Sequence, residues 1–172
     1  MMTTEENIIG NDVIDLALAH EESDWKDNEF LDKTFTIEEQ NLILSYSLPE
    51  TMVWILWSMK ESAYKIYSRQ PNHTVYDPIL LVCHDLDNKE NCFFGRVRYE
   101  EQDLFTMTFI SNDCIETIAV EKHEYFDKIS IVDDSTIITE INDLPGFYDE
   151  NKQRYRSVSI SHHGRYKRIV AL

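Results

Sequence analysis

The sequence predicts an α+β fold in which a small antiparallel sheet packs on one long buried helix. From Thr51 to Tyr67, apolar side chains fall on most faces of a helix, which is typical of a buried helix. After Ile79, short apolar runs are separated by polar turns, which is the pattern of antiparallel strands. A chain of 172 residues is long enough for a real hydrophobic core and is predicted to form a single domain.

The first half of the chain is predicted to hold one strand, three helices and a loop. They are a strand from about Ile8, helices over Leu16–Trp25, Ile37–Tyr46 and Thr51–Tyr67, and a loop over Ser68–Pro78. The second helix has the clearest start, because Thr36 and Glu39 have the spacing of a capping box. Pro49 separates it from the long helix that follows.

The second half is predicted to be a series of strands. They are Ile79–Cys83, Cys92–Tyr99, Leu104–Ile110 and Cys114–Glu121, the weaker candidates Ile129–Val132 and Thr136–Ile141, and finally Ser157–Ser161 and Lys167–Leu172. The last two strands are expected to form a hairpin, because Gly164 suits the turn between them. Leu144–Asn151 contains proline and glycine and is predicted to be a loop. We interpret the stretch 87–151 as an extension that adds a β-hairpin region to a minimal fold.

Composition excludes several classes of function. The formal net charge of −16 argues against nucleic acid as the main partner. The three cysteines show no C-x-x-C spacing, which indicates reduced thiols rather than disulfides or a zinc site. The apolar runs are too short to cross a bilayer, and the polar first residues do not look like a signal peptide. We therefore expect a cytoplasmic protein.

The charge is unevenly distributed along the chain. From Asn151 to Leu172 there are six basic and no acidic side chains, whereas the rest of the chain carries 10 basic and 32 acidic ones. Such a local basic segment suits a phosphate or an acidic partner. The alternative is an exposed basic strand pair that binds nothing.

Two charges interrupt the long apolar helix. Glu61 and Lys65 lie four residues apart and therefore share one face of it. Charges on a buried helix are costly unless they are paired or bind something. An ordinary Glu–Lys helix pair explains this spacing as well as a functional site does, so the spacing alone leaves both interpretations open.

Three separated segments carry a family resemblance. They are Ile9–Val13 (I-G-N-D-V), Trp57–Lys65 (W-S-M-K-E-S-A-Y-K) and Ser159–His162 (S-I-S-H). Together they resemble the 4′-phosphopantetheinyl transferase superfamily, whose hallmarks are G-x-D, W/F-x-x-K-E-x-x-x-K and S-x-S-H. Phe35–Glu39 is similar to the F-T-x-x-E that precedes the second motif. The position of S-x-S-H at the end is similar to the short holo-acyl-carrier-protein synthase type.

The resemblance implies a magnesium-dependent transferase. Its reaction moves the phosphopantetheine arm of coenzyme A to a serine of an apo acyl or peptidyl carrier protein and releases 3′,5′-ADP. Asp12 and Glu61 match the metal ligands, and Mg²⁺ prefers carboxylate, phosphate and water oxygens. Glu61, or a water that it orients, would take the serine proton. Lys65 matches the lysine that stabilises or protonates the leaving phosphate oxygen.

Further residues are implied to bind coenzyme A. Lys60 and Arg69 would neutralise phosphate charge, while Ser161 and His162 would approach the nucleotide end, with His162 at the 3′-phosphate. Asp15 matches a position that is often acidic in the short type, and alternatively it caps the following helix. His163 is expected to be a surface residue.

The sequence departs from the family pattern in two places. No glycine-rich turn follows Lys65, and the basic residues that often follow G-x-D and dock the acidic carrier are missing. A non-catalytic module that binds coenzyme A or a carrier protein is therefore one alternative, and a metal-dependent phosphohydrolase is another. Because short members are trimers with shared sites, we expect a homo-oligomer, a trimer being favoured. Asp12, Glu61 and Lys65 would then come from one protomer and His162 from the next.

Overall fold

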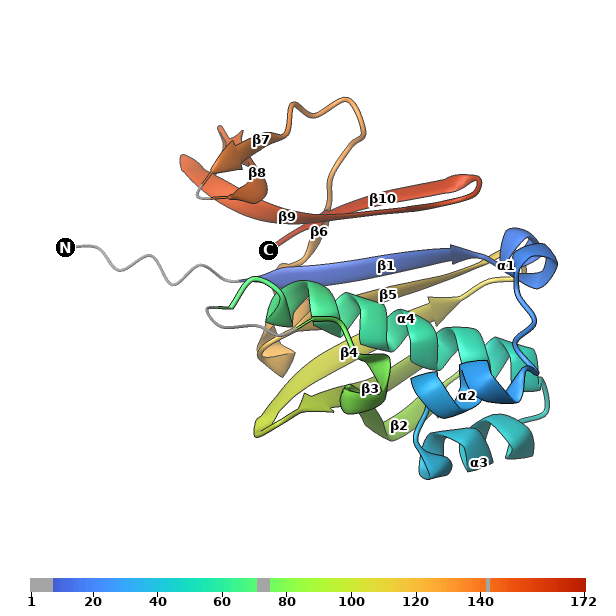
Figure 1. Ribbon diagram of the computed structural model, residues 1–172. Coiled ribbons are helices and arrows are strands. Elements are labelled where there is room, and N and C mark those ends of the chain that lie inside the picture. The colour runs from blue at the N-terminus through green and yellow to red at the C-terminus, as the bar shows by residue number, and fades with distance from the viewer. Residues whose placement is uncertain (1–7, 71–74, 142) are drawn as a thin grey trace.

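The computed structural model describes residues 8–70, 75–141 and 143–172. Within these residues the chain forms two five-stranded antiparallel sheets and a set of helices that covers one face of the first sheet (Figure 1). The predicted α+β class with a long helix packed on a sheet is confirmed. Among the helices of the described part, none is long and apolar enough to span a membrane.

The helices lie mostly in the first half of the chain. They are α1 (Leu16–Glu22), α2 (Asn28–Thr34), α3 (Ile37–Ser45) and α4 (Pro49–Tyr67), with short 3₁₀ turns η1 (Pro78–Leu80) and η2 (His123–Lys128). The capping box of α3 is confirmed, because Thr36 N donates to Glu39 Oε2 at 2.8 Å and Glu39 N donates to Thr36 Oγ1 at 3.2 Å. The first helix ends at Glu22, earlier than predicted, and α2 was not predicted.

The two sheets divide the strands by sequence. The first holds β1 (Ile9–Asp15), β2 (Val82–Lys89), β3 (Cys92–Tyr99), β4 (Gln102–Ile110) and β5 (Cys114–Val120) in the order β1-β5-β4-β3-β2. The second holds β6 (Ser130–Ile131), β7 (Thr139–Ile141), β8 (Leu144–Asp149), β9 (Arg154–His163) and β10 (Tyr166–Ala171) in the order β6-β10-β9-β8-β7.

Two sequence-based interpretations of the second half need correction. The stretch 87–151 is not only an extension, since it supplies β3, β4 and β5, which lie between β2 and β1 in the first sheet. The predicted loop Leu144–Asn151 is wrong, because strand β8 occupies most of it. Gly146 is there for packing and not for a turn: a Cβ on it would lie 2.7 Å from the carbonyl oxygen of Arg156 on β9.

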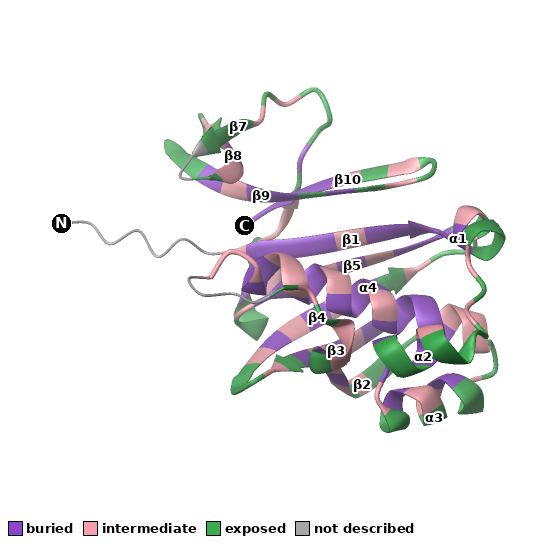
Figure 2. Cartoon of the chain, viewed as in Figure 1, coloured by how far each residue is buried: buried purple, intermediate pink, exposed green. Residues whose placement is uncertain are grey.

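The main core lies between α4 and the first sheet. Figure 2 shows buried residues along α4 and β1, and α4 side chains such as Ile55, Leu56 and Ile66 have no exposed surface. The helix approaches β1 so closely that a Cβ on Gly10 would lie 2.0 Å from the carbonyl oxygen of Ser62. Only glycine permits this contact. The glycine of the G-x-D segment therefore brings Asp12 next to the charged face of α4.

Candidate active site

Asp12 lies on β1 where that strand packs against α4. The pKa of Asp12 is raised to about 7, mainly by burial. The positive charge on Lys65 lowers this pKa, and the negative charge on Glu61 raises it. Its Oδ2 atom is buried and has no hydrogen-bond partner among the described residues. Because the pKa stays raised, Lys65 compensates the charge of this buried carboxylate only in part. The carboxylate is therefore suited to a cation.

Lys65 lies near this carboxylate and joins the two sheets. Its Nζ donates to the carbonyl oxygens of Asn11 on β1, at 2.6 Å, and Ile160 on β9, at 2.9 Å. Burial lowers the pKa of Lys65 below its usual value, against the opposite effect of the charges on Asp12 and Glu61. The ammonium group has three donors, and these two contacts leave one of them for a further acceptor.

A cleft of about 380 Å³ brings the predicted residues together. Asp12, Glu61 and His162 line it, and Phe30, Trp54 and Trp57 give it an apolar wall. All three polar residues come from one chain, because β9 runs beside β1 (Figure 1). The expectation that His162 would come from a neighbouring subunit is therefore wrong for this cleft, which His162 of the same chain lines.

The pair Asp12 and Glu61 fits a magnesium ion. In the described part of the chain, no three His, Cys, Asp or Glu side chains form a group that could hold a metal by themselves. Mg²⁺, however, is commonly held by one or two carboxylates together with substrate phosphates and water. The unpartnered oxygen of Asp12 and the second carboxylate beside it meet that description.

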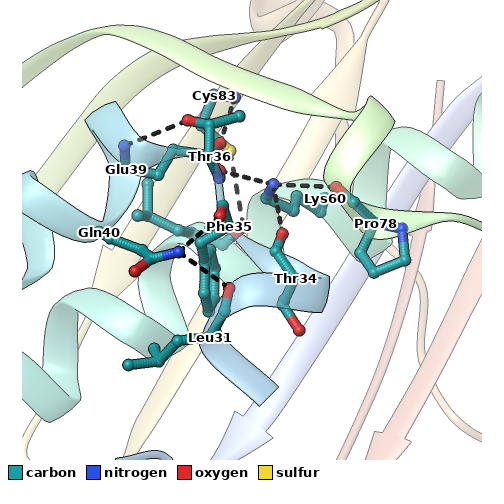
Figure 3. A network of polar contacts seen from close by, with 10 residues as sticks. Leu31, Thr34, Phe35, Thr36, Glu39, Gln40, Lys60, Pro78 and Cys83 are labelled. Carbon is teal, nitrogen blue, oxygen red and sulfur yellow. Dashed lines mark hydrogen bonds and ion pairs between the residues drawn. The ribbon is translucent and has the colours of Figure 1, made fainter. Parts of the chain in front are cut away.

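Lys60 does not reach the cleft, and its predicted role in binding phosphate is wrong. Its side chain has no exposed surface and lies at the interface of α4 with α3 (Figure 3). Its Nζ donates to Thr34 O at 2.9 Å, Glu39 Oε2 at 2.8 Å and Pro78 O at 2.9 Å. One helical residue corresponds to a rotation of about 100°, so Lys60 points away from the face that carries Glu61.

Ser161 and Arg69 also serve to join the strands. Ser161 is buried, and its Oγ accepts from Asn11 Nδ2 at 3.0 Å. Arg69 donates to Ile9 O on β1 and to Val158 O on β9, both at 3.2 Å. Both side chains therefore have structural partners within the fold, and their roles as coenzyme A ligands stay predictions.

The basic segment at the end of the chain is largely neutralised within the fold. Four of its six cations form ion pairs, which are Arg156 with Asp149, Arg165 with Asp15, Lys167 with Asp134, and Arg168 with Glu116. These four cations therefore already have carboxylate partners within the fold, and the phosphate or acidic-partner site stays a prediction. Lys152 and Arg154 are exposed.

Tyr76, beside the site, had escaped the sequence analysis. Burial, followed by the charge of Glu61, raises the pKa of the Tyr76 phenol, whose hydroxyl is buried without a partner among the described residues. No motif marks this residue, which lies in a predicted loop. Asp15 is confirmed as the cap of α1, since its Oδ1 accepts from Ala17 N at 3.2 Å. His163 is partly exposed, as expected of a surface residue, but it also has a structural partner, because its Nδ1 accepts from Asp15 N at 2.9 Å.

Comparison with known proteins gives the family of the chain. A family model described as the 4′-phosphopantetheinyl transferase superfamily matches residues 8–106, which is more than half of the 172 residues. The match includes Asp12, Glu61 and Lys65, and it ends before the strand that carries His162. A search of curated proteins found no match. With its motifs assembled at one cleft and this match, the chain belongs to the 4′-phosphopantetheinyl transferase superfamily.

Proposed function

We propose that the protein transfers 4′-phosphopantetheine from coenzyme A to a serine of an apo acyl or peptidyl carrier protein, with Mg²⁺ as cofactor and 3′,5′-ADP as the second product. Family membership supports phosphopantetheine transfer in general. The observation that carries the finer proposal is the cleft itself. It places two carboxylates and a histidine within one chain, with Lys65 beside the carboxylates.

The reaction requires charge neutralisation and alignment more than covalent catalysis. The serine oxygen attacks the phosphorus that carries the pantetheine arm, and the bond from this phosphorus to the oxygen bridging it to 3′,5′-ADP breaks. Bound to Asp12 and Glu61, Mg²⁺ would supply positive charge to the pyrophosphate. Burial of Asp12 makes that pairing favourable, because a cation would compensate the part of its charge that Lys65 does not.

Glu61 is the candidate base for the serine proton. It is partly exposed, lines the cleft and follows the buried Lys60 on α4, so its carboxylate is accessible while its helix is fixed. A carboxylate within hydrogen-bond reach of a hydroxyl, directly or through one water, is sufficient for general base catalysis. The proton then leaves with Glu61 or with that water.

Lys65 is the candidate donor to the leaving oxygen. Two carbonyl oxygens fix its ammonium group and leave one N–H available. Its lowered pKa means that it releases a proton more readily than an exposed lysine does. His162 is exposed at the edge of the same cleft, where it would face the 3′-phosphate, and the aromatic wall suits the uncharged part of coenzyme A.

Mass spectrometry tests the proposal directly. Apo carrier proteins of several types are incubated with the purified chain, coenzyme A and Mg²⁺, and the carrier mass is measured before and after. We expect the mass to increase by one phosphopantetheine group only when Mg²⁺ is present. Saturable coenzyme A binding without a mass change on any carrier would favour a binding module. Cleavage of coenzyme A without a carrier would favour a phosphohydrolase.

A further inference from the structure

The tip of the β9–β10 hairpin is seated on the end of β1. Gly164 forms the turn with a φ of 52°, in the left-handed region that favours glycine. A Cβ on this residue would lie 2.5 Å from Asp15 Oδ2. The turn and the end of β1 are therefore in direct contact.

Asp15 holds this tip through its side chain and its backbone. Its Oδ2 accepts from Arg165 N at 3.0 Å and from Arg165 Nε at 2.8 Å, and its Oδ1 accepts from Arg165 Nη2 at 2.8 Å. Its own N–H donates to His163 Nδ1 at 2.9 Å. Bidentate arginine–carboxylate pairs are among the strongest and most directional polar contacts in proteins. Asp15 is buried, so its carboxylate is shielded from water, although Arg165 is exposed.

These contacts fix His162 from both sides. The residue before it, Ser161, is bonded to Asn11, and the residue after it, His163, is bonded to Asp15. Asp12 lies between these two anchors on β1. Since β1 and β9 belong to different sheets, side chains fix their relative position.

We propose that Asp15, His163 and Arg165 form a latch of positioning residues that holds His162 at the cleft of Asp12 and Glu61. The role assigned to His162 rests on the proposed function. In this latch, Asp15 and Arg165 act together to hold the hairpin. This role does not require Asp15 to bind a metal or Arg165 to bind a phosphate. It also explains why the chain completes the cleft with its own hairpin.

A double-mutant cycle tests whether the latch acts through His162. Transfer is measured for Arg165→Ala and His162→Ala and for the double variant, with Arg165→Lys as the conservative variant. Arg98→Ala is the matched control, since it removes an exposed arginine that forms a similar bidentate pair, with Asp103, outside the basic segment. We expect Arg165→Ala to lower kcat/KM on the order of ten- to a hundredfold, the scale of a displaced active-site group. Arg165→Lys should recover part of the loss, and Arg98→Ala should match the wild type.

The decisive comparison is between the effect of Arg165→Ala in the wild type and its effect in the His162→Ala protein. If the latch positions this histidine, Arg165→Ala should cause almost no further loss in the His162→Ala protein. An equal loss in both backgrounds would overturn the proposal, because a general structural role does not depend on His162. Unchanged transfer by Arg165→Ala would overturn it as well.

Histidine NMR gives a readout that does not depend on transferase activity. In the folded protein His163 Nδ1 is an acceptor, so the neutral ring carries its proton on Nε2. We expect Arg165→Ala to shift the ring nitrogen signals of both His162 and His163, with circular dichroism confirming the fold. Unchanged signals would refute the latch even if the protein proves to have another activity. Shifted signals in a chain with no transfer to any carrier would refute the proposed function and leave the latch standing.

Discussion

Replacing Asp12 with asparagine should stabilise the metal-free protein while abolishing its activity. Burial raises the pKa of Asp12 from 3.8 to about 7. Because the folded-state pKa is the higher one, ionisation of Asp12 opposes folding. This cost is absent below the unfolded pKa, grows as the pH rises between the two values, and is complete above about 7. At about 1.4 kcal/mol per pKa unit it is on the order of 4 kcal/mol.

The gain from Asp12→Asn has this figure as its upper bound, because the buried amide still needs hydrogen-bond partners. We expect chemical unfolding in EDTA to give a higher free energy of unfolding for the variant at pH 8. Its advantage should shrink as the pH falls to 5. Phosphopantetheine transfer should fall at least about a hundredfold, the scale of losing a charge-stabilising group.

Addition of Mg²⁺ with coenzyme A supplies the control for this experiment. Ligands that bind only the folded wild type should raise its stability and remove the advantage of the variant. A variant that is less stable than the wild type at pH 8 in EDTA would refute the reasoning on burial. Near-normal transfer by the variant would refute the metal assignment.

Three further substitutions test other parts of the structure. Lys60→Met leaves the buried Glu39 unpaired and should cost about 3 to 5 kcal/mol in urea unfolding; wild-type stability with weaker coenzyme A binding would instead restore Lys60 to the site. Lys65→Ala should slow the single-turnover rate more than it weakens coenzyme A binding measured by calorimetry, because charge on the leaving group develops only in the transition state; the reverse pattern would make it a ground-state anchor. Gly10→Ala should lower the melting temperature, because its Cβ would lie 2.0 Å from Ser62 O; an unchanged melting temperature would contradict the close packing of β1 on α4.

The helices and strands that a pattern within their own sequence marks were predicted most accurately. The apolar run of α4, the capping box of α3 and the alternation in β3, β4 and β5 each gave elements close to those observed. These signals are local, because burial and capping repeat with the period of the helix or strand itself. The same local rules failed for β8, where Pro145 and Gly146 suggested a loop. Gly146 serves a contact with another strand that no local pattern records.

For the candidate site, too, some features could be predicted from the sequence and others only from the tertiary structure. The sequence by itself determined which residue types belong to the family motifs, and the cleft brings Asp12, Glu61 and His162 together, with Lys65 beside the two carboxylates. Only the tertiary structure decided which motif residues face the cleft. Lys60 is adjacent to Glu61 in sequence, yet the helical rotation buries it against α3.

The tertiary structure also decided where the C-terminal charges act. Composition counts the six basic side chains of the last segment, but their pairing depends on residues that lie far away in sequence, such as Asp15 for Arg165. A charge count sums side chains without their distances, whereas the energy of an ion pair depends on separation and burial. The sequence therefore determined that the segment is basic, and the fold determined that most of this charge holds the hairpin to the rest of the chain.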